Sequence, residues 1–362
     1  MRPRSQALIA LLSIGACGRS GLLDVPSQSS PQAGGAGGTG GALAVGGGGG
    51  TGGATSAGGA TGAGGAPNPC AGPHTVTEFA LPLRRSQPRG IAAGPDGNVW
   101  FTEYKANVIG RISMTGTITE FPILTSDSGP FGIVAGLDGR IWFTEVLAHQ
   151  YGYTTPGHMA EGSLPLGSLP KSITLGPDGN PWFTGYGPDS IAAVTNQGVV
   201  SYDACGSGVW VGLVTGPDGN LWATGQEVDS ICRLSLDGTA TRFDLPAPHS
   251  QPWGIAAGAD GALWFAEYGG SRIGRISTLG VIAEFETPTA DSYPVSIVAA
   301  PSGALWFTED KGNNIGCITT SGEIVEFPVP TRGSSPDGIA LGPDGNIWFA
   351  EQAADKLGRI NP

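Results

Sequence analysis

Glutamate recurs at one fixed position of a repeated motif. Five copies of a Trp-Phe-(Thr/Ala)-Glu sequence end in Glu103, Glu145, Glu267, Glu309 and Glu351. Clustered carboxylates raise one another's pKa or bind a cation, and their hard oxygen atoms suit Mg²⁺ or Ca²⁺. One hypothesis is therefore a metal site formed by Glu309, Asp337 and Glu351. At such a site a carboxylate of raised pKa would abstract a proton beside a metal-polarised carbonyl group.

The same glutamates also have a structural explanation. They are part of a repeat, and they could lie at a solvated rim. There their charges could be satisfied by Lys105, Lys311 or Lys356, or by backbone amides. The sequence leaves the two explanations open.

A general base could also come from histidine. The chain has four histidines, of which His149 and His249 fall in predicted loops on the glutamate side. A histidine in a surface loop commonly has no catalytic role, so either assignment competes with that simpler one. The candidate catalytic residues are Glu351, Asp337 and His249.

The elements that position these residues form an internal repeat. Seven tryptophan-centred motifs of the type GPDGNVWFTE follow one another at spacings of 42, 40, 40, 42, 42 and 42 residues. In the first copy, turn residues separate four short apolar segments, which we predict to be antiparallel strands. The predicted strands are Gly90 to Gly94, Val99 to Glu103, Val108 to Ser113 and Thr117 to Phe121.

Seven four-stranded repeats predict an all-β, seven-bladed β-propeller over residues 71–362. The first strand of each repeat is small and apolar, as expected for the strand nearest the axis. A fourth-strand signature, an acidic residue followed by an aromatic one, already occurs at Glu78-Phe79, before any first strand. We therefore expect the N-terminal strand to join the last blade and close the ring, which leaves no exposed sheet edge. We expect a monomer.

One face of this disc should carry the site. The start of each first strand and the end of each second strand meet there, because neighbouring strands are antiparallel. A small-molecule or peptide ligand is expected at the channel mouth on this face. The residues predicted to contact it are Arg89, Phe131, Trp253, Glu103, Glu145 and Glu267. Trp210 is expected at the same rim, whereas the blades of Lys171 and Val211 have glycine at the glutamate position.

The N-terminal region predicts export and a lipid anchor. Residues 1–17 have a charged start, an apolar run and the sequence Ile14-Gly15-Ala16-Cys17, which is typical of a bacterial lipobox. Lipidation at Cys17 would be the membrane contact, and Gly18 favours the outer membrane or cell surface. Residues 18–70 are rich in Gly, Ala, Ser and Thr and predict a flexible tether. An ordinary cleaved signal is the alternative.

Charge and cysteine usage narrow the classes of partner. The formal net charge is −12, so binding to nucleic acid is not expected. The five cysteines show no metal-binding spacing. One disulfide, between Cys205 and Cys232, is possible.

The repeat resembles that of the virginiamycin B lyase (streptogramin B lyase) family. The segments Trp264-Phe265-Ala266-Glu267, Ser271 to Ile276 and Ala283-Glu284-Phe285 carry the resemblance, which covers about residues 74–362. It implies a seven-bladed propeller that opens the ester of cyclic streptogramin B antibiotics by elimination, with Mg²⁺ and a histidine base. In this sequence the two motif histidines are replaced by Val295 and Asp337, and an acidic residue of the last motif by Ser335.

Two functions follow from these observations. The first is a metal-dependent C–O lyase acting on a cyclic depsipeptide, as the resemblance implies. The second is a non-catalytic propeller that binds a ligand or protein and is displayed as a surface lipoprotein. The second explains the tether, the lipobox and the substituted histidines together.

Overall fold

The computed structural model describes residues 68–155, 157–165, 167–187, 190–203, 205–206 and 208–362. All of them lie in the second of two compact units, residues 63–362. The predicted signal sequence, Cys17 and most of the 18–70 tether lie outside the described residues. The described part of the chain contains no helix that could span a membrane.

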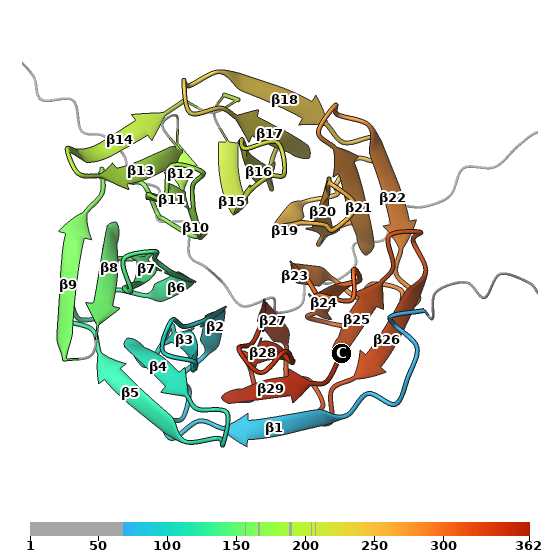
Figure 1. Ribbon diagram of the computed structural model, residues 1–362, viewed down its shortest axis with the longest axis horizontal. Helices are drawn as coiled ribbons and strands as arrows, with labels where there is room; N and C mark the ends of the chain where they lie inside the picture. The colour runs from blue at the N-terminus through green and yellow to red at the C-terminus, as the bar shows by residue number, and fades with distance from the viewer. Residues whose placement is uncertain (1–67, 156, 166, 188–189, 204, 207) are drawn as a thin grey trace, which may run out of the picture. The chain divides into compact units, whose positions relative to one another are not determined.

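The described residues form seven antiparallel sheets arranged as blades around one axis (Figure 1). Each blade runs from an inner strand to an outer strand. Blade 1 contains β2 (Pro88–Ala93), β3 (Val99–Glu103), β4 (Val108–Ile112) and β5 (Ile118–Pro122). Blade 2 contains β6 (Pro130–Ala135), β7 (Ile141–Glu145), β8 (Gln150–Thr155) and β9 (His158–Ser163). Blade 3 contains β10 (Ile173–Leu175), β11 (Pro181–Thr184), β13 (Ile191–Thr195) and β14 (Gly198–Tyr202).

The remaining blades repeat this order. Blade 4 contains β15 (Gly208–Thr215), β16 (Leu221–Gly225), β17 (Ser230–Leu234) and β18 (Ala240–Asp244), and β12 (Tyr186–Gly187) pairs with β15. Blade 5 contains β19 (Pro252–Ala257), β20 (Ala262–Glu267), β21 (Arg272–Ser277) and β22 (Ile282–Glu286). Blade 6 contains β23 (Pro294–Ala299), β24 (Leu305–Glu309), β25 (Asn314–Ile318) and β26 (Ile324–Pro328). Blade 7 contains β27 (Pro336–Leu341), β28 (Ile347–Glu351) and β29 (Lys356–Ile360).

The N-terminal strand completes blade 7, as predicted. Strand β1 (Val76–Ala80) pairs antiparallel with β29, from Val76 opposite Ile360 to Ala80 opposite Lys356. Figure 1 shows this blue strand beside the red end of the chain. The all-β, seven-bladed fold with this closure is confirmed.

The inner strand of blade 1 begins two residues earlier than predicted, at Pro88, which precedes a β-bulge. In blade 1 the bulge lies between Pro88 and Ile91. Behind it, Gly90 packs so closely on blade 2 that an added Cβ would lie 2.2 Å from the carbonyl oxygen of Phe131. The Thr102 hydroxyl accepts from Gly90 N (2.9 Å) and donates to that same carbonyl (2.7 Å). The Thr102 hydroxyl thus links neighbouring blades near the axis, and glycine at position 90 allows their close approach.

The repeated tryptophan and phenylalanine form the core between blades. In β3, Trp100 packs toward blade 2 with Phe143, whereas Phe101 packs toward blade 7 with Trp348. Both β3 side chains are almost completely buried. The Trp100 indole donates to Asp96 in the preceding turn at 3.0 Å. Each second strand therefore contacts both neighbouring blades, and alternate residues face opposite ways.

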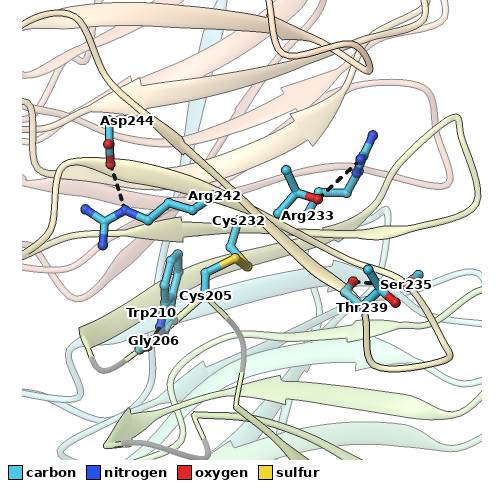
Figure 2. Close-up of a disulfide and its surroundings, with 10 residues drawn as sticks. Cys205, Gly206, Trp210, Cys232, Arg233, Ser235, Thr239, Arg242 and Asp244 are labelled. Carbon is cyan, nitrogen blue, oxygen red and sulfur yellow. Dashed lines mark hydrogen bonds and ion pairs between the residues drawn. A yellow bond between two sulfur atoms is a disulfide. The ribbon is translucent and has the colours of Figure 1, made fainter.

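The propeller contains two disulfides, one local and one between distant parts of the chain. Cys205 and Cys232 are bonded, as the sequence had allowed (Figure 2). Cys70 is bonded to Cys317 across 247 residues, a pair that the sequence did not suggest. The second bond fixes the segment before β1 to β25 of blade 6.

Candidate functional site at the channel mouth

Two cavities lie at the ends of the inner strands. The first, the lumen cavity, has a volume of about 110 Å³ and is lined by residues from six inner strands and by Lys171 and Ser172, which immediately precede β10 of blade 3. The second, the mouth cavity, has a volume of about 330 Å³ and shares Arg89, Trp253, Val295 and Asp337 with the first. Its other lining residues include Gln226, Tyr268, Asp310 and Gln352, which follow the second strands. The expected concave site is present in the structure.

An ion pair crosses from blade 1 to blade 7 at this site. Arg89 Nη1 lies 2.7 Å from Asp337 Oδ2, and both side chains are largely buried. Burial raises the pKa of Asp337, and the positive charge of Arg89 opposes that shift. The guanidinium also lies over Phe131, with its carbon 5.4 Å from the ring centroid. Asp337 therefore has a cation as its partner.

Lys171 supplies a second cation to the lumen cavity. Its ammonium nitrogen lies 5.1 Å from the ring centroid of Trp253, two blades away. Burial lowers the pKa of Lys171, and the charge of Arg89 lowers it further, while Glu227 opposes both. Within the described residues this ammonium makes no ion pair or hydrogen bond. The lumen thus carries two positive charges and one negative charge from Asp337.

Aromatic side chains line one side of the mouth. The rings of Trp253 and Tyr268 have centroids 5.6 Å apart, and Tyr268 meets Tyr293 at 4.9 Å. Trp253 is placed at the mouth as the sequence indicated. Trp210 is not, because it is fully buried beneath blade 4. The expectation of Trp210 at the rim is wrong.

The glutamates occupy a different place from the one expected. Glu103, Glu145, Glu267, Glu309 and Glu351 are all completely buried, and none lines the lumen or mouth cavity. The alternation within β3 explains this, because Glu103 lies two residues after Phe101 and so shares its face toward blade 7. These five side chains lie between blades.

Each buried glutamate is close to a second carboxylate on the outer strand. Burial raises the pKa of Glu103 to about 8, and the negative charge of Glu120 raises it further. Burial likewise raises the pKa of Glu145 to about 7, with Glu161 as its neighbour. The other pairs are Glu267 with Glu284, Glu309 with Glu326, and Glu351 with Glu78. We call these five sets the carboxyl pairs.

In the blade 7 pair, the outer member Glu78 is the ionised one. Glu78 accepts from the backbone N of Thr331 (2.8 Å) and its hydroxyl (2.9 Å), and its Oε2 lies 2.6 Å from Lys356 Nζ. Although burial opposes the shift, these contacts lower the pKa of Glu78. Burial, followed by the charge of Glu78, raises the pKa of Glu351 to about 7. Below about pH 7, the proton of this pair is therefore on Glu351.

The buried serines of the connecting loops cover the carboxyl pairs. Six of the seven loops from an outer strand to the next inner strand carry a Ser-X-Pro sequence, and five of these serines are fully buried. They are Ser86, Ser128, Ser250, Ser292 and Ser334. The residues on either side of Ser86, Arg85 and Gln87, have positive φ angles of 59° and 53°. The pairs thus support the loops that shape the mouth.

The residues present do not fit a magnesium ion at the mouth. The described residues contain no group of three or more His, Cys, Asp or Glu side chains placed to hold a metal. Glu309 and Glu351 point between blades, while Asp337 faces the lumen and pairs with Arg89. The structure therefore does not bring together the three ligands proposed from the sequence, and no chemical step through a metal is derived.

The two candidate histidines hold loops. The backbone N of His249 donates to Asp229 Oδ2 at 2.8 Å, and His249 lines a separate surface cavity with Gln226, Glu227, Asp229 and Gln251. His149 Nδ1 accepts from the backbone N of Leu169 at 3.4 Å. Neither histidine lines the lumen or mouth cavity.

Sequence reasoning missed the residues immediately after the second strands. Tyr268, Asp310 and Gln352 each follow a buried glutamate by one position and line the mouth. They lie one residue beyond the strands, where the alternation of side chains along a strand no longer fixes their direction. Tyr293, in the loop before Pro294, lines neither cavity but contacts Tyr268, and no sequence signal marked it.

Known proteins share this architecture and much of the sequence. The virginiamycin B lyase family matches residues 70–207 and 201–362. A solved streptogramin B lyase is 38% identical, covering 80% of this chain and 97% of its own, with a TM-score of 0.76. Virginiamycin B lyase from Staphylococcus aureus is 37% identical, covering 80% of this chain and 100% of its own, with a TM-score of 0.76.

A third solved structure is a catalytically inactive histidine-to-alanine variant of the Staphylococcus aureus enzyme with quinupristin. It is 36% identical and covers 80% of this chain and 100% of its own, with a TM-score of 0.76. The similarity spans all seven blades. This chain therefore belongs to the virginiamycin B lyase family.

Proposed function

We propose that this chain is a ligand-binding propeller of its family that does not carry out the histidine-dependent elimination. The observation that carries the proposal is the pair formed by Asp337 and Arg89, 2.7 Å apart. Asp337 stands where the family motif has a histidine, and its carboxylate is occupied by a cation. Val295 stands at the other histidine position and has no group that can accept a proton.

The mouth retains what a binding site needs. Its cavity of about 330 Å³ is at the lower end of the range for small-molecule sites. Trp253 and Tyr268 offer ring faces for stacking on an apolar or ring-bearing ligand. Gln226, Asp310 and Gln352 add polar groups around them.

The proposal includes display outside the cytoplasm. Lipidation of Cys17 would anchor the chain to a bacterial outer membrane or cell surface, and residues 18–70 would act as the tether. The supporting observations are the lipobox and the Gly-rich composition of that segment. Cys17→Ala should move the chain from the detergent phase to the aqueous phase in a partition assay. Equal partitioning of the two forms would refute the anchor.

A lyase acting on a cyclic depsipeptide is the second candidate. Identities of 36–38% to solved lyases, one of them with quinupristin, favour it. The test incubates the purified full chain with quinupristin and Mg²⁺ and follows ring opening by mass spectrometry. We expect saturable binding by calorimetry with no ring opening. Turnover above the rate without protein would overturn the non-catalytic proposal, and absence of both binding and turnover would overturn the binding proposal as well.

A further inference from the structure

We propose that the lumen cavity binds a carboxylate group, held between Lys171 and Arg89, of a ligand whose adjoining apolar part occupies the mouth cavity. The inference rests on the proposed binding function and names the ligand class. Its ligand is a small molecule or peptide that ends in a free carboxylate next to a ring-bearing or apolar group.

The first argument is the balance of charge around the axis. In ring order the lumen is lined by Asp337, Arg89, Phe131, Lys171, Val211, Trp253 and Val295, one from each blade. The two cations flank Phe131, and among the described residues the carboxylate of Asp337 pairs with Arg89 alone. A monoanion above Phe131 would neutralise the remaining positive charge.

The second argument is that both cations have unused donors. The Lys171 ammonium has no ion pair or hydrogen bond within the described part of the chain. Arg89 gives one hydrogen bond, from Nη1 to Asp337, and its buried Nε has no partner there. Buried donors without acceptors cost free energy, which an incoming carboxylate with two acceptor oxygens would recover.

The third argument is size and continuity. The lumen cavity of about 110 Å³ has room for a carboxylate, and the mouth cavity of about 330 Å³ has room for a larger group. It shares Arg89, Trp253 and Asp337 with the larger mouth cavity. A ligand could therefore place its charged end in the lumen while its adjoining group stacks on Trp253 and Tyr268.

The geometry also explains why Lys171 is a cation rather than a residue that packs like Val211. Its ammonium nitrogen lies 5.1 Å from the ring centroid of Trp253, and this attraction stabilises the positive charge without using the hydrogen-bond donors of the ammonium. Burial and repulsion from Arg89 disfavour the charged form of Lys171, and a bound carboxylate would stabilise that form.

The test titrates the full-length chain with N-acetyl-glycyl-phenylalanine and with its C-terminal amide. The two probes differ only in charge at one end. We expect the acid to bind roughly tenfold or more tightly than the amide, because charge-assisted hydrogen bonds are about twice as strong as neutral ones. Raising the ionic strength should weaken binding of the acid alone.

Two variants with opposite expected effects make the test specific. Lys171→Met keeps the length of the side chain and should abolish the preference for the acid. Asp337→Asn removes the competing anion, so it should strengthen acid binding. Lys105→Met, at an exposed lysine outside both cavities, is the matched control and should leave the preference unchanged. Thermal unfolding of each variant checks that it is folded. If Lys171→Met does not fold, Asp337→Asn and the ionic-strength series test the carboxylate site in its place.

The possible results separate this inference from the proposed function. Equal affinity for acid and amide, or an acid preference that survives Lys171→Met, would overturn the carboxylate site while leaving ligand binding intact. Binding of quinupristin without binding of either probe would do the same. Failure of all three compounds to bind would overturn both proposals.

Discussion

Blades with a glutamate at the end of the second strand and blades with a glycine there solve the same packing problem differently. In blades 1, 2, 5, 6 and 7 a buried carboxyl pair fills the space beneath the connecting loop. In blade 3 a Cβ on Gly185 would lie 2.1 Å from the carbonyl oxygen of Ser168, so the loop backbone itself occupies the space. In blade 4 the indole of Trp210 lies against Gly225, 3.0 Å from where a Cβ would be.

This difference indicates what the glutamates are for. If they bound a ligand, the glycine blades would leave gaps in a binding surface. Instead, a loop backbone in blade 3 and an indole ring in blade 4 fill the space that the carboxyl group fills elsewhere. Such a substitution of one filling group by another is expected if the glutamates have a structural role. Figure 2 shows Trp210 beside the disulfide between Cys205 and Cys232, which further fixes this irregular part of the ring.

The largest effect is expected in the glycine blades. Trp210→Ala would remove a fully buried indole and leave a cavity beneath the loop of blade 4. We expect a loss of about 3–5 kcal/mol in the free energy of unfolding. Denaturant unfolding measures it, with Trp253→Ala at the mouth as the control that should cost far less. Equal losses of unfolding free energy in the two variants would show that Trp210 does not fill the space beneath the loop of blade 4.

A smaller and pH-dependent effect is expected in the glutamate blades. The folded-state pKa of Glu103 is raised from 4.5 to about 8, so its contribution to stability is complete below pH 4.5 and is lost as the pH rises through 8. Glu103→Gln cannot ionise and should be more stable than the parent at pH 8 by roughly 1–3 kcal/mol. At pH 4.5 the two proteins should unfold alike. Thermal unfolding across this range measures the difference, and a variant that is less stable at pH 8 would contradict the assignment.

The first residue of the third strand should tune each carboxyl pair. It is Val108 in blade 1 but Lys356 in blade 7, where its ammonium bonds Glu78. Val108→Lys should therefore lower the pKa of Glu103 and stabilise the protein at pH 8 by about 0.5–1 kcal/mol. Carbon-detected NMR titration of the glutamate carboxyl groups checks the shift. An unchanged Glu103 pKa would mean that the lysine does not reach the pair; Val108→Met controls for loss of the valine.

The smallest effect is expected on ligand binding. Glu351→Gln changes a buried group between blades and leaves both cavities intact, so the affinity for quinupristin should change less than about twofold. Trp253→Ala is the positive control for the same calorimetric titration, because that ring lines both cavities. A large loss of quinupristin affinity in Glu351→Gln would show that the glutamates take part in ligand binding.

The sequence was sufficient for the ring and its closure but not for the direction of the glutamates. The repeat of tryptophans and the early Glu78-Phe79 pair predicted seven blades and the pairing of β1 with β29. The same repeat places Glu103 near the mouth, yet in a propeller both faces of a second strand meet neighbouring blades. Only the inner strands face the axis, which is why Arg89, Phe131, Trp253 and Asp337 line the lumen.

The partners of charged groups depend on pairs of distant blades. Arg89 and Asp337 are 248 residues apart, and no local pattern links them. Lys171 and Trp253 meet only because the ring is narrow at its axis. Tyr293 comes from a loop with two positive φ angles, at Asp291 and Tyr293 itself, and the sequence does not specify where such a loop directs its side chains.

The bond between Cys70 and Cys317 also has a mechanical consequence. Cys70 precedes β1, the five-residue outer strand that closes blade 7 by pairing with β29. A pulling force on the polypeptide before Cys70 is transferred through the disulfide to blade 6. The force therefore does not separate β1 from β29 one residue pair at a time. Reduction of that bond would shift the load onto the five backbone pairings of β1, and the ring would open at its seam under forces that the oxidised protein withstands.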